Sequence, residues 1–111
     1  MVVDEQLANR IRTTLKRKEV AFVEKRMFGG LGFMVRGNMC VGIMKTGEFM
    51  VRVGKERHEE VVKRPYAKVM NFTGRPMKGF VEIKVEGIES EADLEEWIGL
   101  GLVFNKMLPE K

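Results

Sequence analysis

The chain has very few of the residue types that carry most catalytic and metal-binding chemistry. Its 111 residues include one cysteine, one histidine and one serine, which are Cys40, His58 and Ser90. A lone cysteine excludes an internal disulfide and any zinc or iron–sulfur site with several cysteine ligands. Apolar neighbours indicate that Cys40 is an inert core thiol, and polar neighbours indicate that His58 lies on the surface. We therefore expect a protein that is not an enzyme and that holds no metal and no cofactor.

Long apolar runs and export signals are also missing. Charged residues interrupt every apolar run well before the ~18 residues that a membrane span needs. The first five residues have neither the basic segment nor the apolar segment of a signal peptide. A free cysteine is typical of a reducing compartment. These features predict a cytoplasmic protein that does not contact a membrane.

The composition is that of a globular domain with an uneven charge. Hydrophobic residues make up 44% and charged residues 32% of the chain, and 20 basic residues exceed 16 acidic ones. Residues 1–89, the basic body, hold 18 basic and 11 acidic residues, a net charge of +7, whereas residues 90–111 have a net charge of −3. A basic body attracts nucleic acid or an acidic protein, although a solvated mixed surface would show the same excess.

The spacing of apolar residues predicts the order of the helices and strands. Leu7, Ala8, Ile11 and Leu15 recur at helical spacing behind Asp4, a suitable N-cap, and residues 20–23 are a short strand or a packed connection. Strands are expected at 31–35, 39–44, 49–53, 69–72 and 81–85, with helices at 55–64 and from Ser90 onward. We expect an α+β fold over a single domain, residues 1–111. It is a two-layer α/β sandwich with an antiparallel sheet and the order α-β-β-β-α-β-β-α.

The strand at 81–85 alternates more cleanly than the others. Val81, Ile83 and Val85 share one face, and Glu82 and Lys84 share the other. Clean alternation is typical of a strand with one solvated face. We therefore expect this strand near an edge of the sheet.

The three strands from 31 to 53 carry apolar side chains on both faces. Val41 and Ile43 share a face, yet Cys40 and Met44 lie opposite; likewise Met34 lies opposite its apolar neighbours. A sheet with two apolar faces needs cover on both sides, and a chain of this length has few helices to supply it. Several of the nine methionines fall in these strands, and methionine suits adaptable contact surfaces. We expect a homodimer, or a docking surface for another partner.

The glycines do not form a phosphate-binding motif. Gly42 and Gly47 have the spacing of a P-loop, but Glu48 stands where a lysine is needed. Gly74 and Gly79 have the same spacing and are followed by an aromatic residue. The glycines are therefore interpreted as turn and bulge positions.

Basic residues near turns and strand ends form a candidate surface for a partner or for nucleic acid. Arg75 and Lys78, which lie nearest the turn after residue 72, are the favoured candidates, because turns display side chains. No helix-turn-helix, zinc finger or RNP signature accompanies them. The candidate residues are Arg26, Arg36, Arg52, Arg75 and Lys78.

Two blocks of the sequence resemble the N-terminal domain of the TfoX/Sxy family. They are RMFGGLGF at 26–33 and NFTGRPMKGF at 71–80, and the closing DLEEW at 93–97 is similar as well. The resemblance covers nearly the whole chain and implies a two-layer α/β fold like that of the secretion chaperones. The motif positions, which we interpret as structural, are Met27, Phe28, Gly29, Gly30, Gly74, Pro76 and Gly79.

The resemblance also implies a function. TfoX/Sxy proteins are bacterial regulators of competence genes and act with a cyclic-AMP receptor-type transcription factor. They typically carry a second, C-terminal domain, whereas the resemblance here is to the N-terminal domain alone. We therefore expect a stand-alone N-terminal domain. The implied role is a small, non-enzymatic regulatory and protein-interaction module, dimeric, with a transcription factor as partner. The alternative is direct binding of nucleic acid through the basic body.

Overall fold

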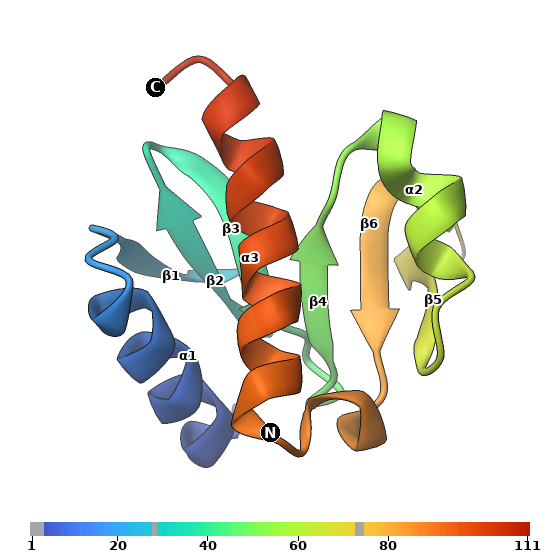
Figure 1. The fold of residues 1–111 in the computed structure, drawn as a ribbon, viewed down its shortest axis with the longest axis horizontal. Helices are drawn as coiled ribbons and strands as arrows, with labels where there is room; N and C mark the ends of the chain where they lie inside the picture. Colours follow the sequence, from blue (N-terminus) through green and yellow to red (C-terminus); the bar gives the residue numbers. More distant parts are fainter. Residues whose placement is uncertain (1–3, 28, 73–74) are drawn as a thin grey trace.

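Three α-helices and six strands build the described part of the chain (Figure 1). The computed structural model describes residues 4–27, 29–72 and 75–111. The helices are α1 (Glu5–Arg17), α2 (Lys55–Val62), α3 (Glu91–Met107) and the short 3-10 helix η1 (Val85–Ile88). The strands are β1 (Val23–Met27), β2 (Gly30–Val35), β3 (Asn38–Ile43), β4 (Phe49–Arg52), β5 (Ala67–Phe72) and β6 (Arg75–Ile83).

All six strands join one antiparallel sheet in the order β1-β2-β3-β4-β6-β5. The predicted α+β class, the antiparallel sheet and the element order are confirmed. One strand is added at an edge, because β1 begins at Val23, where the sequence left a strand or a connection open. The charged run Glu24 to Arg26 in β1 has no apolar alternation, and this is why the pattern did not mark it as a strand.

The three α-helices lie on one face of the sheet, which gives two layers (Figure 1). The α1 residues predicted to share a stripe, from Leu7 to Leu15, are buried in the core. Asp4 caps α1 as expected, since its Oδ1 accepts hydrogen bonds from the backbone N–H of Gln6 at 3.0 Å and of Leu7 at 3.2 Å. The hydroxyl of Ser90 caps α3 in the same way, accepting from the N–H of Asp93 at 3.0 Å.

An ion pair joins α1 to the charged edge strand. The Arg12 guanidinium donates from Nη2 to Oε1 of Glu24 at 2.8 Å and from Nε to Oε2 at 2.5 Å. These hydrogen bonds stabilise the carboxylate and hold the pKa of Glu24 below its ordinary value. The bidentate pair therefore fixes β1 against the first helix.

A β-bulge places Cys40 on the helix side of the sheet. Phe33 pairs with Val41 and Met34 pairs with Met39, so Cys40 is the extra residue between them. Cys40 is fully buried, and its Sγ lies 3.2 Å from where a Cβ on Gly101 of α3 would stand. The prediction that Cys40 and Val41 point to opposite faces was wrong, because the bulge breaks the alternation.

Methionines lie flat over glycines on the second face of the sheet. A Cβ on Gly32 would stand 2.8 Å from the Cε of Met39 and 3.2 Å from the Cε of Met27. In the same way the Cε of Met50 lies over Gly42, and Met50 is buried. The chain thus covers part of this apolar face with its own side chains, which weakens the physical reason to expect a partner there.

Two predictions of solvent exposure were wrong. Strand β6 lies between β4 and the edge strand β5, so its position near an edge is found, but the solvated face expected for it is not, because Glu82 is only 4% exposed; Val85 lies outside the strand, in η1. His58 is only 6% exposed, although its neighbours in sequence are charged. It shares the inner side of α2 with Val61, and three residues is the spacing of one helix face.

Candidate protein-interaction surface

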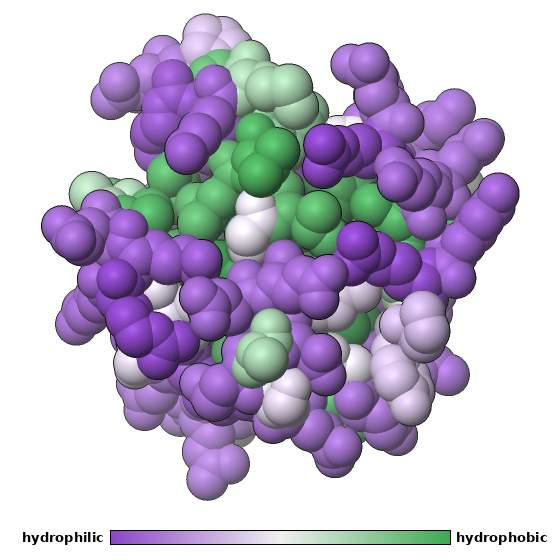
Figure 2. Space-filling model, in the orientation of Figure 1, coloured by the Kyte–Doolittle hydropathy of each residue, from purple (hydrophilic) through white to green (hydrophobic). Residues whose placement is uncertain are grey.

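A stripe of apolar residues lies on the outer side of the C-terminal half of α3. Val103 is 45% exposed and Met107 is 65% exposed, while the others are half-buried. Figure 2 shows hydrophobic atoms gathered in a band across the upper half of this face, bordered by hydrophilic side chains. Exposed apolar patches with a polar rim are typical of protein-interaction sites. We define the α3 stripe as Gly99, Leu100, Val103, Phe104 and Met107.

The two glycines of α3 have opposite surroundings. A Cβ on Gly101 would meet the carbonyl oxygen and Sγ of Cys40 and the Cγ1 of Val51, each at 3.2 Å, so this glycine lets the helix pack closely on the sheet. A Cβ on Gly99 would meet nothing within 4 Å. Glycine in a helix interior costs about 1 kcal/mol relative to alanine. Packing within the chain explains this cost at Gly101 but not at Gly99.

Buried amides hold the C-terminal end of α3 against the β2–β3 turn. Nδ2 of Asn105, which is fully buried, donates to the carbonyl oxygen of Val35 at 3.0 Å and to that of Asn38 at 3.5 Å. Nδ2 of Asn38 donates to the carbonyl oxygen of Pro109 at 2.9 Å. The backbone N–H of Lys111 donates to the carbonyl of Arg36 at 3.0 Å. The α3 stripe is therefore presented on a helix that is fixed at this end.

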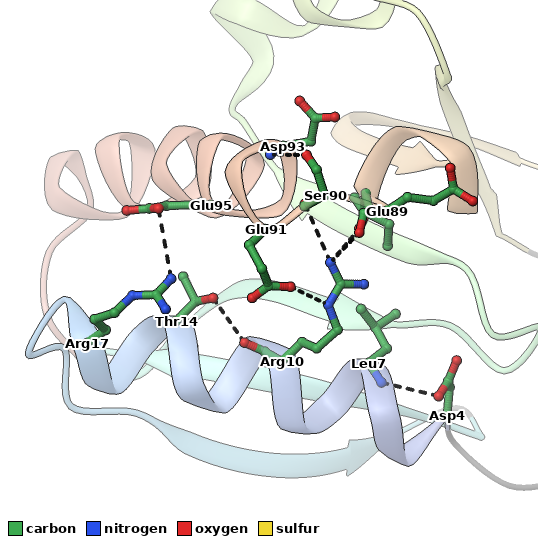
Figure 3. A network of polar contacts seen from close by, with 11 residues as sticks. Asp4, Leu7, Arg10, Thr14, Arg17, Glu89, Ser90, Glu91, Asp93 and Glu95 are labelled. Carbon is green, nitrogen blue, oxygen red and sulfur yellow. Dashed lines mark hydrogen bonds and ion pairs between the residues drawn. The ribbon is translucent and has the colours of Figure 1, made fainter.

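Ion pairs hold the N-terminal half of α3 against the basic body (Figure 3). Arg10 of α1 donates from Nε to Glu91 at 2.7 Å and from Nη2 to the carbonyl oxygen of Ile88 at 2.6 Å. Lys18 pairs with Glu95 at 3.3 Å. Arg64, after α2, pairs with Glu96 at 2.9 Å and lies 5.5 Å from the ring centroid of Trp97. The acidic turns of α3 thus engage cations of the same chain.

The structure brings two of the predicted basic residues to α3. Arg36 has a φ of 55° in the β2–β3 turn and donates from Nη1 to the carbonyl oxygen of Asn105 at 2.8 Å. The guanidinium of Arg52 lies 5.5 Å from the ring centroid of Phe104 and 5.4 Å from that of Phe80. Both arginines therefore border the α3 stripe, where arginine is favoured at protein contacts.

Two of the remaining predicted basic residues, Arg26 and Lys78, lie on separate strands of the sheet. Arg26 is exposed on the edge strand β1, and Lys78 is exposed on β6, with three strands between. Arg75 lies in β6, but its side chain lies outside the described residues. The described part of the chain therefore does not present a continuous basic surface that includes all five residues.

The described motif residues lie at turns and at close contacts between strands. Gly29 and Gly79 have φ angles of 78° and 96°, which glycine adopts without strain. A Cβ on Gly30 would stand 2.3 Å from the carbonyl oxygen of Ile43, so only glycine fits this strand pair. Pro76 pairs with Asn71 in the β5–β6 hairpin. Phe28 and Gly74 lie outside the described residues, and Met27 lies over Gly32 as described above.

Comparison with known families identifies the family of the chain. The family model described as the TfoX N-terminal domain matches residues 15–104. The chain belongs to this family. Comparison with curated proteins and with solved structures gave no match. The described helices of this TfoX N-terminal domain are all too short or too polar to span a bilayer.

The buried cysteine of this TfoX N-terminal domain is in a setting that disfavours its nucleophilic thiolate form. Burial raises the pKa of Cys40 to about 12, because the thiolate would lose its hydration. The thiolate, not the thiol, is the nucleophile. The interpretation of Cys40 as an inert core residue therefore agrees with its surroundings.

Sequence reasoning did not find the α3 stripe. The prediction of a helix from Ser90 onward did not separate its buried apolar residues from its exposed ones. The available signal was the number of apolar residues around residue 100, which is more than one buried side of a helix requires. Such an excess marks either a fully buried helix or one with a second contact.

Proposed function

We propose that this TfoX N-terminal domain is a small non-enzymatic regulatory module that acts by contacting another protein. We propose that the module regulates the transcription of competence genes and that its partner is a cyclic-AMP receptor-type transcription factor. The family resemblance supports both. The cytoplasm is the compartment in which such a module works. The observation that carries the proposal is the α3 stripe, an exposed apolar surface fixed in position at both ends of its helix.

The charge arrangement supports a protein partner over direct nucleic-acid binding. Arg10, Lys18 and Arg64 engage carboxylates of α3, and Arg12 engages Glu24. Nucleic-acid affinity comes chiefly from cations that are available to phosphates. Cations already paired within the chain contribute little to such binding, so the excess of basic residues overstates the attraction for nucleic acid.

Partner binding by a matched pair of variants tests the proposal. The full chain is titrated by calorimetry into the purified cyclic-AMP receptor-type factor of the same organism. Val103→Glu places a charge in the α3 stripe, and Val85→Glu places one at an exposed valine on η1. We expect the native chain and Val85→Glu to bind, and Val103→Glu to lose binding at least about 100-fold.

Two results would contradict the proposal. If the native chain does not bind the factor at about 100 μM but shifts DNA alone in a gel, with affinity that falls steeply with salt, direct nucleic-acid binding replaces the proposal. If Val103→Glu and Val85→Glu bind the factor equally well, the α3 stripe is not the contact surface.

A further inference from the structure

We infer that a second copy of this chain covers the α3 stripe, with the two α3 helices antiparallel and crossing at Gly99. The inference rests on the proposed function only in treating the stripe as a protein contact, and because the factor and the second copy would use the same surface, they occupy it in turn and not together. It goes further because it names the occupant and the arrangement. Three features of α3 carry it: an unexplained glycine, the spacing of the outward residues, and the distribution of charge along the helix.

Gly99 marks the crossing point. It lies in the interior of α3, where glycine costs about 1 kcal/mol relative to alanine, and a Cβ there would meet nothing within 4 Å. Glycine on an outward position allows another backbone to approach closely, since no side chain stands between. In the single chain Gly99 has a cost and no benefit, whereas at a helix crossing it permits close packing.

The outward residues of α3 have the spacing of a helix–helix contact. Ala92, Glu96, Gly99, Val103 and Lys106 are four, three, four and three residues apart, and each is exposed or half-buried. This alternation keeps one side of a helix in contact with a second helix over several turns. Gly99 stands at the middle of the series, so a two-fold axis beside it covers the whole length of α3.

The charges favour a second copy in the antiparallel direction. Acidic residues Glu91, Asp93, Glu95 and Glu96 lie in the N-terminal half of α3, whereas Lys106 lies in its last turn, next to Asn105, whose carbonyl oxygen accepts a hydrogen bond from Arg36. An antiparallel pairing centred between Gly99 and Leu100 brings Asp93 opposite the partner subunit's Lys106, and the reverse. A two-fold interface must be self-complementary, and a helix that is acidic at one end and basic at the other meets this condition only when antiparallel.

Sedimentation equilibrium of the purified full chain between about 10 and 200 μM tests the inference. We expect the native chain and Val85→Glu to dimerise, and Val103→Glu to be at least about 100-fold weaker. Circular dichroism melts of the three proteins confirm that each is folded. A native chain that is monomeric throughout this range overturns the inference, as does a Val103→Glu variant that dimerises like the native chain.

Charge exchange tests the antiparallel arrangement. Asp93→Lys and Lys106→Glu each place like charges opposite one another at both ends of the interface, so each weakens dimerisation roughly tenfold. The double variant, and an equimolar mixture of the two single variants, restore opposite charges at both ends and recover native affinity. Single variants that dimerise as well as the native chain, or a double variant that does not recover, overturn the arrangement.

The two proposals fail separately. A monomeric native chain that still binds the transcription factor through Val103 leaves the proposed function standing and removes the second copy. A dimer that Val103→Glu breaks, in a chain that binds no factor, keeps the second copy and removes the proposed function.

Discussion

Asn105 is the residue that connects the end of α3 to the sheet. Its Nδ2 donates to two backbone carbonyls, those of Val35 and Asn38, in a fully buried setting. Asn105→Ala leaves both carbonyls without this donor and opens a small cavity, so we expect the free energy of unfolding to fall by about 2 kcal/mol. Urea denaturation measures it, with Glu110→Ala as an exposed control that changes stability by less than about 0.5 kcal/mol. Equal losses in both variants would contradict this role of the amide.

Cys40 predicts a dependence of stability on alkaline pH. Burial raises the pKa of this thiol from its ordinary value to about 12. Above pH 9 the unfolded chain therefore releases the thiol proton while the folded chain keeps it, so the free energy of unfolding falls by about 1.4 kcal/mol per pH unit until the folded pKa. Unfolding of the native chain and of Cys40→Ala at pH 8 and pH 10 measures this. The difference in stability between the two proteins should shift by about 1 kcal/mol, and an unchanged difference would show that the thiol titrates normally when folded.

The two glycines of α3 predict opposite responses to one substitution. Gly99→Ala adds a methyl group in open space and removes the cost of glycine, so it should stabilise the monomer by about 1 kcal/mol. Gly101→Ala forces a Cβ to 3.2 Å from the backbone oxygen of Cys40, so it should destabilise by about 1 to 3 kcal/mol. Thermal melts at low micromolar concentration compare the two. A destabilising Gly99→Ala would mean that the helix surface at this position is not open.

Most elements followed from the sequence, and the failures have physical causes. Caps and apolar spacing marked α1 and α3 because both signals are local. Strand β1 was not marked, because its charged residues are held by a distant partner, Arg12, that no local pattern reveals. The bulge at Cys40 was not marked either, since alternation assumes a regular strand. The candidate site shows the same limit: Arg36 and Arg52 were singled out, but their convergence on α3 is a tertiary fact.

At the scale of the whole molecule, α3 serves as an internal acidic partner for the basic body. Residues 90–111 have a net charge of −3 and residues 1–89 a net charge of +7. The ion pairs of Glu91, Glu95 and Glu96 bring these two parts together. The net charge of +4 is therefore a poor guide to how the surface meets a polyanion. The arrangement of the charges, and not their sum, sets that affinity.

This predicts that neutralising α3 converts the chain into a nucleic-acid binder. Replacing Glu91, Glu95 and Glu96 by glutamine frees their cations and raises the net charge from +4 to +7. We expect affinity for duplex DNA at 50 mM salt to rise roughly tenfold or more, with a steeper loss as salt increases, since each new phosphate contact adds about 0.9 to the slope of log K against log salt. The matched control replaces three exposed carboxylates of α2 that lie outside the ion pairs described above: Glu56, Glu59 and Glu60. It has the same net charge but frees none of those cations, so its affinity should rise much less, and equal affinities in the two triple variants would show that net charge alone decides the binding.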